Sequence, residues 1–206
     1  ARTSTPVFVT VASAANAQHD AARLAPVCAA RASFCDTGTL VEGRDLLGPE
    51  VHAPSTLRAS CPDGDQGTYL REESIERIVL RTDDGLELAP GKEARVEVTV
   101  FASSAFDADA LDLFHATAAD SPSWRWVATL RPPRAGLQVL STTYRLPPGS
   151  LQAVRARFRY GGSAAPCGTL TADGTLGFAS RIPFTASATS LTVRVYSPAA
   201  GIPVRL

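Results

Sequence analysis

The chain has 206 residues and equal numbers of basic and acidic side chains, 20 of each, so its formal net charge is zero. This balance leaves no electrostatic basis for binding nucleic acid or an anionic membrane surface. Hydrophobic residues make up 45% of the sequence, enough to build a core, and no apolar run reaches the roughly 18 residues of a membrane-spanning helix. We therefore expect one folded domain with an appendage, no nucleic-acid partner and no membrane span.

The first 27 residues are interpreted as an extended N-terminal arm. Residues 6–11 predict a lone strand, and residues 12–24, which are rich in alanine, predict a short helix or a linker. The apolar residues of the strand are Val7, Phe8, Val9 and Val11. A strand that a linker separates from the body can pair with its own sheet edge or with that of a neighbouring molecule, and the sequence leaves both open.

The rest of the chain is dominated by the two-residue alternation of apolar and polar side chains that half-buried strands show. In residues 94–101, for example, the even positions are apolar while Arg95, Glu97 and Thr99 are polar. Similar runs cover residues 74–82, 110–117, 124–130, 137–146, 151–160 and 191–196. Short strands separated by glycine- and proline-rich turns predict an all-β fold, a jelly-roll-like antiparallel β-sandwich over residues 28–206.

Four cysteines form an even set without any C-x-x-C pair or nearby histidine, which favours disulfides over a zinc site. Disulfides indicate an oxidising location, so we expect a secreted protein; four reduced, buried cysteines in a cytosolic protein are the alternative. Of the three possible pairings we expect Cys35 with Cys61 and Cys28 with Cys167. The second bridge would then tie the N-terminal region to a late strand and close a long loop.

Several motifs keep the order and spacing of a known family. They include Cys35-Asp36-Thr37-Gly38, Ala59-Ser60-Cys61, Glu73-Ser74-Ile75-Glu76-Arg77-Ile78 and Ser121-Pro122-Ser123-Trp124. Over residues 28–167 the chain resembles a poorly characterised, cysteine-containing β accessory domain of secreted bacterial proteins, often attached to extracellular proteases and other hydrolases. The resemblance implies an exported, non-catalytic β domain. After Cys167 the family has an acidic run, whereas residues 168–174 here contain one carboxylate, Asp173.

No catalytic signature is evident in the sequence. Residues 161–165 come closest to the nucleophile elbow of hydrolases, but Ala165 stands where the elbow needs its second glycine. The three histidines, His19, His52 and His115, are far apart in the sequence. We therefore expect a protein that is not an enzyme.

Calcium is the one cofactor for which the sequence offers candidate ligands. Asp63 and Asp65 lie two residues apart in a glycine-containing loop, and Glu72 and Glu73 follow closely. Carboxylate and main-chain oxygens of such a loop can converge on Ca²⁺. The alternative interpretation is a solvated acidic loop beside a disulfide, because the remaining ligands of an EF-hand loop are missing.

Two groups of side chains are candidates for binding a partner. Trp124 and Trp126 share one face of a predicted strand, where two rings can stack on a sugar or on a partner surface. We nevertheless expect at least one of the two indoles to pack inside. Arg155, Arg157 and Arg159 share one face of another predicted strand and suit sulfates, uronates or a carboxylate-rich partner. For the arginines, the alternative is a solvated outer face paired with acids.

Together these features predict a secreted recognition or adhesion module that binds extracellular polysaccharide or a cell-surface protein. The alternative is a structural subunit of an extracellular filament or coat, in which residues 6–11 of one copy pair with the next copy. Deletion of residues 1–11 distinguishes the two hypotheses. A binding module would tolerate the deletion, whereas a strand-lending subunit would no longer assemble.

Overall fold

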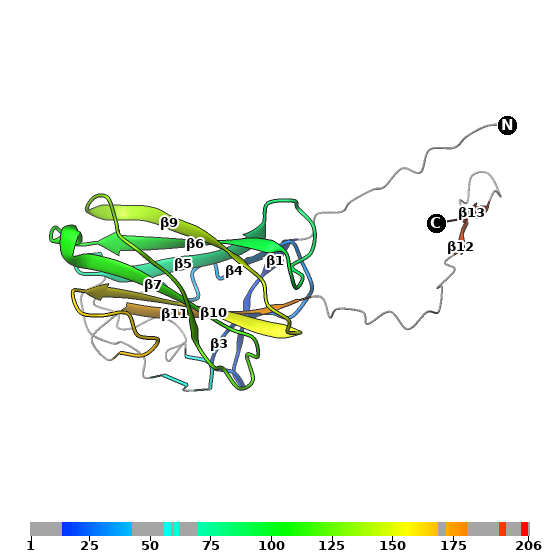
Figure 1. The fold of residues 1–206 in the computed structure, drawn as a ribbon, viewed down its shortest axis with the longest axis horizontal. Helices are drawn as coiled ribbons and strands as arrows, with labels where there is room; N and C mark the ends of the chain where they lie inside the picture. The colour runs from blue at the N-terminus through cyan, green and yellow to red at the C-terminus, as the bar shows by residue number, and fades with distance from the viewer. Residues whose placement is uncertain are drawn as a thin grey trace.

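The computed structural model describes residues 14–42, 56–58, 60–61, 70–168, 172–180, 194–196 and 203–205. In this part of the chain two β-sheets pack face to face, so the expected all-β sandwich is confirmed (Figure 1). Among the described residues the one helical element is the short 3-10 helix η2 (Phe106–Ala108), and no helix there is long and apolar enough to cross a membrane.

The two sheets have five and six strands. Sheet A has the order β1 (Ala14–Asn16), β4 (Phe34–Asp36), β5 (Ser74–Thr82), β6 (Glu93–Ala102) and β9 (Gly136–Arg145). Sheet B has the order β2 (Gln18–Asp20), β3 (Ala25–Cys28), β11 (Ala172–Ala179), β10 (Leu151–Tyr160), β7 (Asp109–Ala116) and β8 (Arg125–Leu130). A separate hairpin consists of β12 (Arg194–Tyr196) and β13 (Pro203–Arg205).

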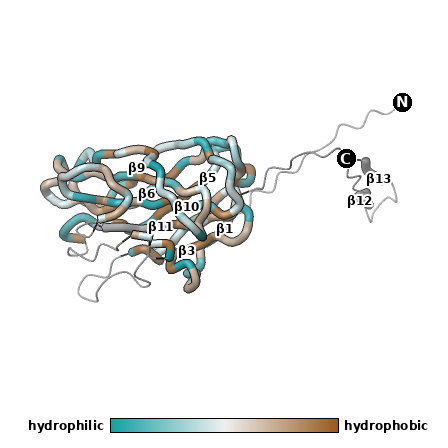
Figure 2. The backbone as a smooth tube through the Cα atoms, turned by 60° about the horizontal axis from the view of Figure 1, so that its bottom comes forward, coloured by the Kyte–Doolittle hydropathy of each residue, from teal (hydrophilic) through white to brown (hydrophobic). Residues whose placement is uncertain are grey.

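The alternation seen in the sequence determines which side chains lie between the sheets. In β6 every second residue is fully buried, whereas Glu97 and its outward-facing neighbours are partly exposed. Sheet B faces these residues with the buried apolar residues of β7, β10 and β11, which form one core cluster with them. The changes between hydrophobic and hydrophilic residues along the strands can be followed in Figure 2.

Two strand pairs of the sandwich differ from the expected antiparallel arrangement. β1 pairs with β4 in parallel, and β11 pairs with β3 in parallel. Both pairs join strands that no hairpin connects, and only such non-local pairs can be parallel. A two-residue alternation carries no information about strand direction, so the sequence pattern could not distinguish these pairs.

The prediction of a helix or linker over residues 12–24 is also wrong for the part that the structure describes. Ala14 and Ala15 pair with β4, and the Ala17 N–H donates to the Asp36 carbonyl at 2.7 Å. The helix propensity of these alanines is weak compared with sheet pairing to the folded body. The sandwich therefore already includes residues 14–28, while the predicted strand over residues 6–11, with Val7, Phe8, Val9 and Val11, lies outside the described residues.

Both disulfides are present, but the expected pairing is wrong. Cys28 bonds to Cys35, and Cys61 bonds to Cys167. The chain crosses from β3 in sheet B to β4 in sheet A between the first two cysteines, so residues only seven apart face each other across the core. Their bridge clamps the two sheets together. The expectation from loop length did not take this crossing into account.

A second, smaller apolar cluster lies on the outer face of sheet B. Ala116 of β7 and Ala153 of β10 contribute to it from the sheet, and Leu57 covers them from a loop. The Cys61–Cys167 bridge then connects this loop to residues 161–168, which follow β10. The outer face of sheet B thus carries a layer of loops that a two-layer sandwich does not require.

Candidate functional site

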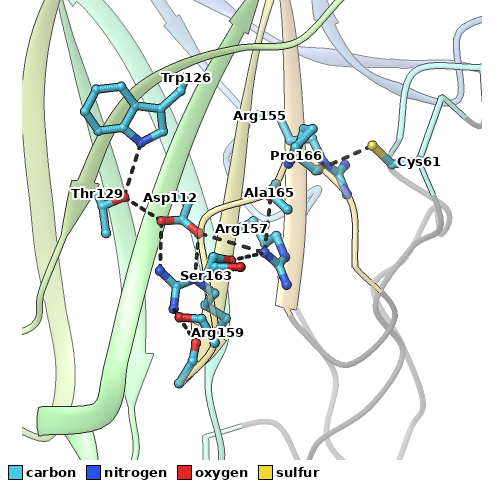
Figure 3. Close-up of polar contacts among 12 residues, drawn as sticks. Cys61, Asp112, Trp126, Thr129, Arg155, Arg157, Arg159, Ser163, Ala165 and Pro166 are labelled. Carbon is cyan, nitrogen blue, oxygen red and sulfur yellow. Dashed lines mark hydrogen bonds and ion pairs between the residues drawn. The ribbon is translucent and has the colours of Figure 1, made fainter.

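Three arginines of β10 point to the outer face of sheet B and lie beneath this loop layer (Figure 3). Arg155 is fully buried, Arg159 is 6% exposed, and the side chain of Arg157 is 11% exposed. The strand alternation placed the arginines on one face as expected. Their burial distinguishes them from a solvated stripe, because a buried guanidinium must find acceptors inside the protein.

The loop of residues 161–168 supplies those acceptors through its main-chain carbonyls. Arg155 Nε donates to the Pro166 carbonyl at 2.7 Å, and Arg157 Nη1 donates to the Ala165 carbonyl at 3.2 Å. Arg159 Nη1 donates to the Gly162 carbonyl at 2.8 Å. The loop can turn back over its own strand because Gly162 has a φ of +69°, a conformation that side chains disfavour. The arginines therefore hold the loop against the sheet.

Asp112 of β7 provides the negative charge of this cluster. It is fully buried, and its Oδ2 accepts a hydrogen bond from Arg159 Nε at 2.7 Å. Arg159 Nη2 lies 3.3 Å from Oδ1, and Arg157 Nη1 lies 3.9 Å from Oδ2. A charge-assisted pair of this kind holds both partners in one geometry.

Trp126 of β8 is connected to the same carboxylate. Its indole Nε1 donates to Thr129 Oγ1 at 3.2 Å, and Thr129 Oγ1 donates to Asp112 Oδ1 at 2.7 Å. Residues three apart in a regular strand point to opposite faces, but the register of β7 and β8 shifts between Leu113 and Phe114. This bulge brings Trp126 and Thr129 to the same face.

The two tryptophans differ in exposure. Trp126 is 59% exposed, so its ring is available to solvent although its nitrogen is anchored. Trp124 is half-buried: it packs against the second apolar cluster, and its Nε1 donates to Ser60 Oγ at 3.3 Å. One indole therefore supports the loop layer, and the other presents a ring at the surface.

Of the four candidate calcium ligands, the described residues include Glu72 and Glu73. Asp63 and Asp65 lie outside the described residues, Glu72 is exposed, and Glu73 lies beside the buried Asp109. Burial is the main cause that raises the pKa of Asp109, and the neighbouring Glu73 carboxyl adds to it, so that this pKa is about 7. Within the described ranges, no three histidine, cysteine, aspartate or glutamate side chains are grouped so that they could hold a metal ion.

The described histidines lie far from each other. His19 is in β2 and His115 is in β7, with three strands of sheet B between them. His115 stacks on Tyr144, with ring centroids 5.6 Å apart, and burial, together with the charge of Arg125, lowers its pKa. This geometry makes His115 part of the packing between the two sheets.

Asp112 and Thr129 hold the site together but were not among the residues predicted from the sequence. The available signal was Asp112 itself, a carboxylate between leucines in a strand that is otherwise apolar. No protein-family model and no curated protein matches the sequence. In this arrangement a buried ionic cluster supports an exposed aromatic ring.

Proposed function

We propose that the protein is a non-catalytic recognition module that binds polysaccharide through the exposed face of Trp126. The observation that carries this proposal is that the ring is 59% exposed while Nε1 is hydrogen-bonded to Thr129. An indole fixed in this way loses little conformational freedom when it binds. Its flat apolar face suits the C–H face of a sugar ring, as aromatic side chains suit other flat apolar partners.

The surrounding charges favour a neutral polysaccharide over a sulfated or uronate-containing one. The guanidinium groups of Arg157 and Arg159 donate to loop carbonyls and to Asp112, so their hydrogen bonds are directed into the protein. Binding an anion through them would require the loop of residues 161–168 to leave its position. A ligand held by stacking needs no such rearrangement.

Two disulfides support an extracellular setting for this module, because such bonds persist in oxidising compartments. The resemblance to accessory domains of secreted bacterial hydrolases supports the same setting. Outside the cell, a surface that binds a neutral polysaccharide would hold the protein close to that polysaccharide. A hydrolase attached to the protein would be held there as well.

The test is a binding screen of the wild type and Trp126→Ala against neutral and acidic polysaccharides by affinity electrophoresis, followed by calorimetry on any ligand found. We expect Trp126→Ala to weaken binding to a neutral polysaccharide by at least about 10-fold, which corresponds to ~1.4 kcal/mol. Trp126→Phe retains a ring and should retain part of the affinity. The matched control is Leu86→Ala, which removes an exposed apolar side chain from the segment between β5 and β6 and should leave binding unchanged.

Two results would contradict the proposal. The first is a wild-type protein that binds no polysaccharide in the screen. The second is equal affinity for the wild type and Trp126→Ala, which would place any binding surface elsewhere. In Thr129→Val the ring remains, but its Nε1 loses its acceptor and Asp112 loses one donor, so we expect binding weaker than that of the wild type and tighter than that of Trp126→Ala.

A further inference from the structure

β9 is a ten-residue edge strand of sheet A. All of its residues pair with β6 on one side, and no other described strand pairs with its second side, where Figure 1 shows it as the outermost strand. The other described sheet edges are blunted: β1 and β2 have three residues each, and β8 contains the bulge. Short strands and bulges are common protections of exposed edges.

The hydrogen bonds at both ends of β9 show which main-chain groups face outward. Just beyond the end of β9, the Leu146 N–H donates to the Lys92 carbonyl at 2.8 Å. The main-chain groups of the even-numbered residues of β9 therefore point toward β6. Main-chain groups alternate between the two sides of an antiparallel strand, so odd-numbered residues face away. Accordingly, the Leu137 carbonyl accepts a hydrogen bond from Arg134 Nη2 at 3.1 Å, a donor outside the sheet. The outward groups that follow belong to Val139, Ser141 and Thr143.

This outward edge lacks the usual sequence protections. Residues 137–144 contain neither a charged residue nor a proline. Leu137 and Val139 are 51% and 58% exposed on the outer face of sheet A, where Leu137 lies beside Phe101 of β6. A long, uncharged and partly apolar edge is a template for pairing with another strand.

We propose that β9 pairs with β9 of a second copy of the chain, antiparallel and centred on Ser141, so that the two A sheets become one continuous sheet. In this register Val139 of each copy faces Thr143 of the other, and each facing pair exchanges two main-chain hydrogen bonds. The outward main-chain N–H and C=O groups of all three residues then have hydrogen-bond partners. A strand paired with its own copy in this way has twofold symmetry and closes into a dimer.

Charge and side-chain pattern favour a second β9 as the occupant. At this register Arg145 of one copy falls opposite Leu137 of the other, so the arginines at the strand ends do not face each other. The centre of the interface contains only hydroxyl and apolar side chains. Threonine and valine are also well suited to cross-strand contacts.

The first test compares the solution mass of the full chain with that of Ser141→Lys by multi-angle light scattering over a wide concentration range. The substitution places two ammonium groups opposite each other at the twofold axis, which opposes pairing. Within one copy the new lysine lies opposite Glu97, which supports the fold. The matched control, Thr99→Lys, places the same charge on the outer face of the adjacent strand, opposite Val139. We expect dimers for the wild type and the control and a monomer for Ser141→Lys.

The second test is a cysteine cross-link that does not depend on affinity. Facing residues of an antiparallel hydrogen-bonded pair have Cα atoms about 5.5 Å apart, within the range that a disulfide spans. Ser141→Cys should therefore form a covalent dimer under oxidising conditions, whereas Val139→Cys, which faces Thr143, should form far less. Three outcomes would overturn the proposal: a wild type that is monomeric throughout, a Ser141→Lys variant that still dimerises, or a dimer that is lost when residues 1–11 are deleted.

Discussion

Asp112→Asn tests whether the buried ionic cluster stabilises the fold. The substitution preserves the shape of the side chain and removes its charge. Every group that contacts the carboxylate is a donor: Arg159 Nε lies 2.7 Å from Oδ2, and Thr129 Oγ1 lies 2.7 Å from Oδ1. An asparagine can accept at only one of these two positions. Its amide group would face a donor at the other, and Arg159 would lose its counter-charge.

The size of the effect follows from burial. Asp112 is fully buried, and the Arg159 side chain is 7% exposed, so solvent cannot replace the lost interaction. Removing one partner of a buried pair costs about 3–5 kcal/mol. For a chain of this size, each kcal/mol lowers Tm by roughly 2–4 °C, so Asp112→Asn should lower Tm by about 6–20 °C.

The assay is equilibrium urea unfolding at pH 7, with Asp83→Asn as the matched control. Asp83 also pairs with two arginines, Arg81 and Arg95, but its side chain is 53% exposed. Solvent screens exposed pairs, so this variant should lose much less stability. If Asp112→Asn costs no more free energy of unfolding than Asp83→Asn, the reasoning from burial is refuted.

Two further predictions concern the loop layer and the pH dependence of stability. The Cys61–Cys167 bridge closes a span of 106 residues, so replacing both cysteines with alanine should lower the free energy of unfolding by about 4.8 kcal/mol, measured by chemical denaturation. The Cys28–Cys35 bridge spans seven residues, and an equal or greater loss on its removal would contradict this prediction. Burial raises the pKa of Asp109 to about 7 from an ordinary value of 3.8, so the folded state holds a proton that the unfolded state releases, and stability should fall as pH rises from about 4 through 7. In urea titrations across that range Asp109→Asn should flatten this decline, and an unchanged slope would exclude Asp109 as its source.

Much of the fold follows from local patterns in the sequence. The alternation in β6 predicted its buried and exposed faces, and the alternation in β10 predicted that Arg155, Arg157 and Arg159 share a face. These predictions succeed because successive side chains of a strand point to opposite sides, whatever the strand packs against. The even number of cysteines likewise predicted two disulfides.

The sequence by itself determined the all-β class, the positions of the strands from β5 to β10 and, in their regular stretches, the face on which each side chain lies. Only the tertiary structure decided whether a face is covered, which cysteines meet, which strand pairs are parallel and which edge stays open. Arg155 shows why. Its direction is set by its own strand, but its burial depends on the loop of residues 161–168. The Pro166 carbonyl of this loop accepts a hydrogen bond from Arg155, and its Cys167 is bonded to Cys61. Alternation is a property of the local backbone, whereas burial, pairing and exposure depend on segments that are distant in the sequence and meet only when the chain folds.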